Sequence, residues 1–334
     1  MMNRKYRIYR QRMMIAALLH LWAACTTDSI TPDGETDPSG NTLQLLSVLM
    51  EETGTPRSIV TGETLQQLRL YATDQTDKHE TYKGAEGSSS DGSADYIRSG
   101  SSWRQTGDKK IIIKTDTPPA IHAFSPNDLT VTNTGYDSHT IPVTVLTADD
   151  FSIGKQTDYL YATPVWLGAG EKVVTLSMHH ALAKVSLQIS KATTIAEGET
   201  MTVTQVEIIS KSNALKSGTG KMSLDNGGIE ELAGTPVLTL TSATGSNLVY
   251  TPDAPTASAL VAPVTLPAND LSFRITLSGH DTPFVTAPVS TGQTWKQGVH
   301  YLYTVTLSKT EAAFQSVSMY DWQSDASQNT NIGI

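Results

Sequence analysis

The residues best suited to metal chemistry in this sequence are its eight histidines. His179 and His180 are adjacent, and neighbours on a strand point to opposite faces, so the two could not ligate one ion without a bulge. The other histidines of the folded part are scattered singly, as is typical of surface or satisfied core positions; they lie at 79, 122, 139, 280 and 300. No H-E-x-x-H or C-x-x-C motif occurs. The sequence therefore predicts no metal site.

Residues 217–221 (SGTGK) come close to a phosphate-binding loop. The pattern requires Gly where the chain has Leu215, and Ser or Thr where it has Met222, so we interpret the segment as a turn. Paired carboxylates at 149–150 and 230–231 fall in expected loops, with no further polar group predicted to converge on them. We therefore expect no cofactor and no enzymatic activity.

The single cysteine, Cys25, directly follows a segment typical of an export signal. A basic stretch precedes a mostly apolar run over residues 13–24, which has signal-peptide length and is too short to span a bilayer. The run ends in LWAAC, which resembles the lipobox cut by the lipoprotein signal peptidase. We expect residues 1–24 to be removed by cleavage between Ala24 and Cys25, and Cys25 to be lipidated. The alternative is an ordinary secretory signal with an incidental thiol, because Trp22 stands where a lipobox usually has an aliphatic residue.

Residues 25–41, which begin with the cysteine, are rich in Thr, Asp, Pro and Gly, and we expect them to be a flexible tether. The formal net charge of the chain is −9, and the leader holds five basic and no acidic residues, so the mature part is more acidic still. Such a surface would repel phosphate backbones, so nucleic acid is not an expected partner.

Short runs of Val, Ile, Leu, Thr and Tyr between Gly, Pro, Asn and Asp indicate a mostly β chain. Leu271–Leu277 alternates apolar and polar residues, which is typical of antiparallel sandwich strands. We expect two antiparallel β-sandwich domains, over residues 42–163 and 164–334. Residues 110–114 are expected to form a strand, and the Gly/Ser-rich residues 83–107 a surface loop inserted between strands.

The segment 43–50 (LQLLSVLM) has strand length and is apolar in both registers of a strand. Its apolar residues are Leu43 and Leu45 in one register, and Leu46, Val48 and Met50 in the other. The pattern predicts that the strand is covered on both sides, and that its loss would leave a groove needing replacement.

A Gly/Pro-marked link follows this segment and carries Arg57 and Ser58. A trypsin-like protease could cut between these two residues; the alternative is a plain surface arginine in a turn. Near the C-terminus, two strand-like runs at 299–307 and 314–322 could stay in the domain or pair with a vacated sheet edge of another subunit. Head-to-tail repetition of such pairing would produce an open fibre.

The chain resembles the fimbrillin (Mfa-like) family of surface fimbria subunits from Gram-negative anaerobes of gut and mouth. The resemblance rests on the order and spacing of several motifs: Trp103 followed by 110–114 and AFSP at 123–126, DYLYA at 158–162, LSMHHALAKV at 176–185, WKQGVHYLY at 295–303, and a final Asp321-Trp322. These motifs cover most of residues 42–322.

The resemblance implies two transthyretin-like β-sandwich domains and export to the cell surface as an outer-membrane lipoprotein. It also implies that an Arg-specific protease cuts after Arg57 and removes the strand over 43–50, and that C-terminal strands of a neighbouring subunit fill the groove. The function implied is that of a structural or anchor subunit of fimbriae that supports adhesion, with other fimbrial subunits as partners.

A different function also fits the sequence. The chain could be a monomeric surface lipoprotein that binds glycan or a host protein through aromatic-bearing loops around Tyr96 and Trp103.

Overall fold

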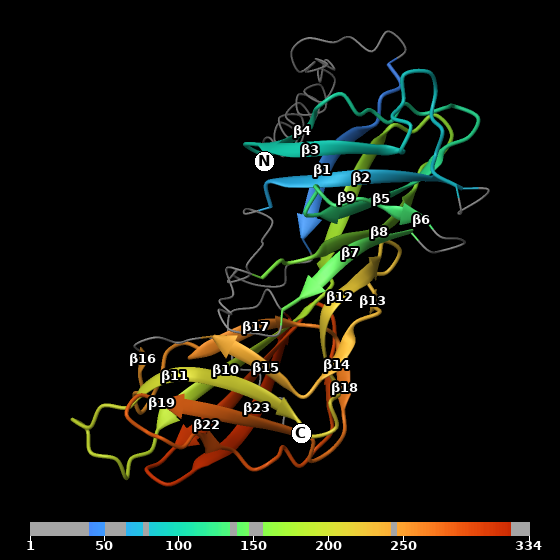
Figure 1. The fold of residues 1–334 in the computed structure, drawn as a ribbon. Coiled ribbons are helices and arrows are strands. Elements are labelled where there is room, and N and C mark those ends of the chain that lie inside the picture. The colour runs from blue at the N-terminus through green and yellow to red at the C-terminus, as the bar shows by residue number, and fades with distance from the viewer. Residues whose placement is uncertain are drawn as a thin grey trace, which may run out of the picture. The chain divides into compact units, whose positions relative to one another are not determined.

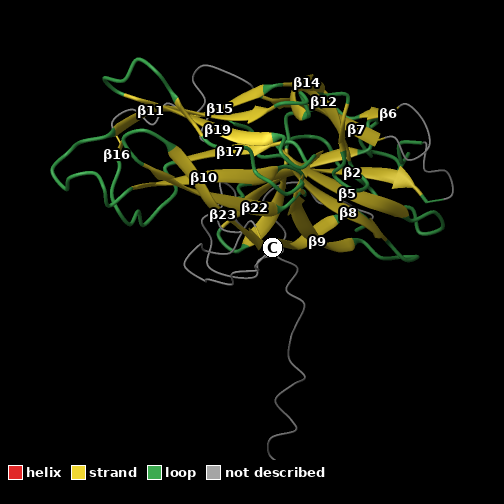
Figure 2. Cartoon of the chain, turned by 90° about the horizontal axis from the view of Figure 1, so that it is seen from below, coloured by secondary structure: helices red, strands yellow, loops and turns green. Residues whose placement is uncertain are grey.

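The computed structural model describes residues 40–50, 65–75, 80–133, 139–146, 156–241 and 246–321. This part of the chain contains β-strands and no helix (Figures 1 and 2), which confirms the prediction of an all-β fold. The described residues from Asn41 onward belong to one compact unit. Because none of them is helical, none belongs to a helix that could cross a membrane.

The largest sheet has seven strands in the spatial order β1-β9-β8-β5-β2-β3-β4. In chain order these are β1 (Gln44–Met50), β2 (Gln67–Asp74), β3 (Ser93–Ser99), β4 (Ser102–Thr106), β5 (Pro119–Ser125), β8 (Leu160–Trp166) and β9 (Val173–His180). The sheet curls so that its two edge strands, β1 and β4, approach each other.

Alternation along these strands produces two apolar faces, and each is covered. One face forms a cluster that we call the first core, which includes Leu68, Leu70, Ile121, Leu160 and Leu176. The opposite face carries Tyr71, Phe124 and Tyr161, which pack against a second sheet to form the second core. The second sheet consists of β6 (Thr132–Asn133), β7 (His139–Val145), β12 (Leu215–Ser223), β13 (Ile229–Glu230) and β14 (Ala233–Thr235).

Two further sheets pack face to face as a β-sandwich. The buried side chains between them form a third core, which includes Val185, Val206, Phe273 and Tyr303. The first contains β17 (Ala257–Val261), β10 (Ala183–Lys191), β22 (Val299–Leu307) and β23 (Ala312–Asp321), in that spatial order. The second contains β15 (Val237–Thr241), β11 (Thr202–Ser210), β19 (Leu271–Leu277) and β20 (Phe284–Val285), with β16 (Ser246–Asn247) also paired to β11. Phe273 and Tyr303 join the two sheets, with ring centroids 5.0 Å apart. A separate two-stranded ribbon pairs β18 (Val264–Leu266) with β21 (Gln293–Trp295).

We expected purely antiparallel sheets, but the structure also contains parallel pairs. Among the described strands, β1 runs parallel to β9 and β10 runs parallel to β22, while the other pairs are antiparallel. Each parallel pair joins segments far apart in the sequence, so the alternation within a single strand could not reveal its direction.

Two local expectations, a surface loop and a strand, are corrected by the structure. Residues 83–107 are not one loop, because they contain the β3–β4 hairpin, whose two-residue turn has Gly100 at φ +64°. Residues 110–114 form a single antiparallel bridge, Thr42 with Ile112, rather than a strand. The expected domain boundary between 163 and 164 falls inside β8, and β9 belongs to the same sheet. The second sheet also joins strands from before and after His180, since β7 pairs with β12. The division into two domains stays a prediction.

Candidate functional site

The candidate site is β1 together with the part of the seven-stranded sheet that it covers. A β-bulge lies between Leu45 and Ser47, so Leu46 is an extra residue without a register partner on β9. The bulge shifts the alternation by one residue, which brings Val48 and Met50 onto the same face as Leu43 and Leu45. The side chains on that face pack into the first core: Leu43, Leu45 and Met50 are buried, and Val48 is half-buried.

The outer face of β1 is exposed. Leu46 and Leu49 retain 67% and 55% of their accessible surface, and Val173 at the start of β9 retains 45%. The expectation that both faces of the 43–50 strand are covered is therefore wrong in this chain. The sequence suggested two covered faces because its apolar residues switch from odd to even positions, and the bulge occurs at that switch.

The start of this segment is held by hydrogen bonds as well as by apolar packing. The Leu43 amide donates to the Ile111 carbonyl at 2.8 Å, and the Ile113 amide donates to the Asn41 carbonyl at 2.9 Å. The Tyr96 hydroxyl donates to the Leu43 carbonyl at 2.6 Å, and burial raises the pKa of this phenol. Residues 110–113 form no strand, but their backbone hydrogen bonds hold the residues that lead into β1.

The two aromatic residues considered for ligand binding lie in strands, not in loops. Tyr96 is on β3 with 2% of its surface exposed, and Trp103 on β4 packs half-buried against the first core. Tyr96 is therefore covered, and Trp103 is only partly exposed.

The predicted processing residues lie outside the described residues. This applies to Ala24 and Cys25 in the leader and to Arg57 and Ser58 in the link that follows β1. The structure places the end of β1 at Met50, seven residues before Arg57. Lipidation and cleavage stay predictions.

The C-terminal runs form neighbouring strands, as expected. β22 has the predicted bounds, and β23 is the edge strand of its sheet, paired with β22 alone among the described strands. Tyr320 of β23 covers His300 of β22, with ring centroids 5.9 Å apart, and the His300 Nε2 is 2.8 Å from the Ser186 hydroxyl. Burial lowers the pKa of His300 to about 3, and the nearby Lys184 charge adds to the shift.

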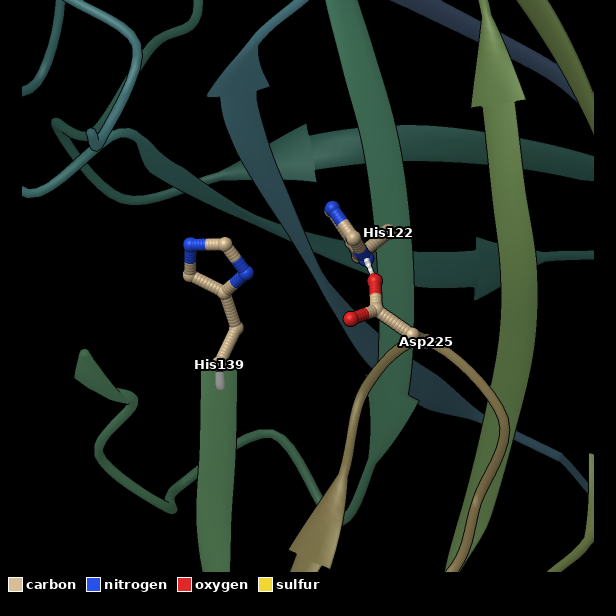
Figure 3. A group of neighbouring side chains, drawn as sticks. All are labelled: His122, His139 and Asp225. Atoms are coloured by element: carbon tan, nitrogen blue, oxygen red, sulfur yellow. Dashed lines mark ion pairs between the residues drawn. The ribbon is translucent and has the colours of Figure 1, made fainter. Parts of the chain in front are cut away.

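A group of potential metal ligands, which the sequence did not predict, lies on the face of the seven-stranded sheet that carries the second core. His122 is on β5, His139 begins β7, and Asp225 is in the turn after β12. One ligand atom from each residue lies within 4.8 Å of the others. Figure 3 shows the three side chains and the segments that carry them. The three residues are far apart in the sequence and belong to no motif, so only the fold brings them together.

The geometry described above is that of an all-β protein with a curled sheet and a β-sandwich. Residues 60–322 match the model of the fimbrillin-like family, and this range covers most of the chain. The chain therefore belongs to the fimbrillin-like family, and the resemblance inferred from its motifs is confirmed.

Solved structures with this fold include three proteins from Bacteroides. A candidate cell adhesion protein from Bacteroides uniformis has a TM-score of 0.57 and 17% identity, over 86% of this chain and 100% of that protein. One from Bacteroides ovatus has a TM-score of 0.56 and 16% identity, over 85% and 98%. A fimbrial protein from Bacteroides vulgatus has a TM-score of 0.53 and 16% identity, over 84% and 99%. At these identities the similarity concerns the fold. No curated protein matches this sequence.

Proposed function

We propose that this chain is a structural or anchor subunit of cell-surface fimbriae, and that subunits join by exchange of the strand beside β9. The observation that carries the proposal is the position of β1. It is an edge strand, and it fills the first core from one side. Membership of the fimbrillin-like family and the fimbrial and adhesion descriptions of the solved structures support the same function.

Removal of β1 would leave a specific vacancy in the sheet. The backbone from Lys172 to Met178, at the start of β9, would lose its partner, because it pairs with Gln44–Met50 on that side. Burial of Leu43, Leu45 and Met50 contributes on the order of 4.5–9 kcal/mol, at roughly 1.5–3 kcal/mol each, and half-buried Val48 adds less. This is comparable with the net stability of a whole domain, so a vacated site would strongly favour a new strand.

A strand from a neighbouring subunit would restore both the backbone pairing of β9 and the apolar burial in the first core. Strand addition supplies main-chain hydrogen bonds to the exposed edge and alternate side chains to the vacated pockets. The C-terminal region has the required apolar content, because Phe314, Val317 and Met319 of β23 already pack against a core. We propose that this region is the donor and that Leu43, Leu45, Leu46, Val48 and Met50 belong to the strand that leaves.

The remaining parts of the proposal concern export and processing. Lipidated Cys25, produced by cleavage after Ala24, would anchor the newly exported chain in the outer membrane. Cleavage by an Arg-specific protease between Arg57 and Ser58 would free β1 and the lipid together. An uncut chain would remain on the membrane as an anchor subunit.

The test is limited trypsin digestion of the purified protein followed by size analysis. We expect cleavage after Arg57 to convert monomer into a ladder of high-molecular-weight species, and Arg57→Ala to abolish the ladder. Arg104→Ala is the matched control, because Arg104 is an exposed arginine within a paired strand, and it should polymerise like the wild type. A cleaved protein that stays monomeric would contradict strand exchange.

A further inference from the structure

We propose that His122, His139 and Asp225 bind one divalent transition-metal ion of the zinc type. The site would join three segments: β5 in the seven-stranded sheet, and β7 and the turn after β12 in the second sheet. It is independent of the proposed role of β1, which lies at the edge of the seven-stranded sheet and contributes to the first core.

The orientation of His122 suits a metal ligand. Its Nε2 atom is 3.1 Å from the hydroxyl oxygen of Thr73, a buried residue on β2. When Nε2 donates its proton to that hydroxyl, Nδ1 carries the lone pair. The Nδ1 atom lies 3.4 Å from the Asp225 Oδ1 atom, and Figure 3 shows the two side chains pointing toward each other. A hydrogen bond to the second ring nitrogen is the usual way in which proteins fix a ligating histidine.

The second histidine is held close to the first. The His122 and His139 ring centroids are 5.6 Å apart, and Tyr71 packs against both rings, with centroid distances of 6.0 Å and 5.5 Å. Both histidine residues are buried, at 2% and 1% exposed. The aromatic packing limits rotation of the rings, so little conformational entropy would be lost when they bind an ion.

The donor set favours zinc over the harder cations. Two imidazole nitrogens and one carboxylate oxygen are a common three-ligand set for Zn²⁺, with water as the fourth ligand, whereas Ca²⁺ and Mg²⁺ prefer oxygen ligands alone. Tetrahedral ligands of zinc are about 3.3 Å apart. The three donors here lie within 4.8 Å of one another, so small side-chain movements would complete the coordination.

An ion and its water could reach the ligands from solvent. The three residues line a cavity of about 340 Å³ together with Thr73, Trp166 and Ser223. The Asp225 side chain is 26% exposed, whereas that of His122 is 3% exposed. The carboxylate therefore stands at the mouth of the site, and the imidazoles form its buried side.

The test is a zinc titration of the full protein, purified without a polyhistidine tag, by isothermal calorimetry and thermal unfolding. We expect one equivalent of Zn²⁺ to bind and to raise Tm, and Ca²⁺ to do neither. His139→Ala should weaken binding at least 10-fold, and Thr73→Val about 10-fold, which is the usual cost of losing a partner that orients a ligand. His280→Ala is the matched control, because His280 is an exposed histidine outside the cluster.

Asp225→Asn keeps the size of the side chain, and it carries the test if His139→Ala fails to fold. We expect it also to weaken zinc binding while strand content in chelator stays unchanged. The proposal is overturned if no saturable binding occurs, if both ligand variants bind like the wild type, or if His280→Ala weakens binding as much as they do. A missing ladder in the trypsin test would not affect this result.

Discussion

The bulge in β1 predicts opposite consequences for two adjacent leucines. Leu45 is 5% exposed and packs into the first core, whereas Leu46 is 67% exposed on the outer face. Leu45→Ala should lower the free energy of unfolding by about 2–5 kcal/mol, and in the lower half of that range because an edge strand can partly close the cavity. Leu46→Ala should change it by less than about 0.5 kcal/mol.

The assay is urea unfolding followed by tryptophan fluorescence, with both variants compared to the wild type at the same protein concentration. The two substitutions remove the same atoms from neighbouring positions, so each is the other's matched control. Equal losses of stability would refute the assigned register. Equal losses are the result expected if both faces of β1 are covered in solution, as the sequence alone suggested.

Two further predictions concern buried polar side chains. The folded-state pKa of His300 is about 3, against an ordinary value of 6.5, so the unfolded chain binds a proton that the folded chain excludes as the pH falls through this window. Acidification from pH 7 to pH 5 should therefore lower the free energy of unfolding by about 2 kcal/mol through this residue. His300→Gln should remove that part of the loss in urea titrations, and a variant that keeps the wild-type pH dependence would contradict the assignment. Tyr96→Phe removes the hydrogen bond to the Leu43 carbonyl and should lower the free energy of unfolding by about 1–2 kcal/mol. Amide hydrogen exchange should become faster in β1 and stay unchanged in β22. A uniform change across the chain would contradict a local role of this bond in holding β1.

The sequence predicted the elements of this fold better than their arrangement. Leu271–Leu277 and Val299–Leu307 have the bounds expected from their apolar runs, because a half-buried strand imposes a period of two on its own residues. The parallel pairing of β1 with β9 depends on segments more than one hundred residues apart and leaves no local pattern. The β3–β4 hairpin was missed because its many Ser and Gly residues are typical of loops.

The candidate sites were predictable to different degrees. The 43–50 segment was recognised from its apolar content, but the position of its bulge depends on β9 and could not be inferred from β1 alone. His122 and His139 were interpreted as scattered residues because ligand spacing is readable only when the ligands share one element or motif. Here the curled sheet and the turn after β12 bring them together.

The central claim is that β1 must leave the edge of β9 before subunits can join. Ser47 of β1 is the register partner of Thr175 of β9, and their hydroxyl oxygens are 3.1 Å apart on the exposed face. A disulfide between Ser47→Cys and Thr175→Cys, in a chain whose only natural cysteine is replaced by Cys25→Ser, would lock β1 in place.

The most direct measurement compares polymerisation of this locked protein after trypsin cleavage, with and without reductant. The account predicts that the oxidised protein stays monomeric, that reduction restores the ladder, and that each single-cysteine variant polymerises under both conditions. A ladder that forms equally well from the oxidised double variant would contradict the account.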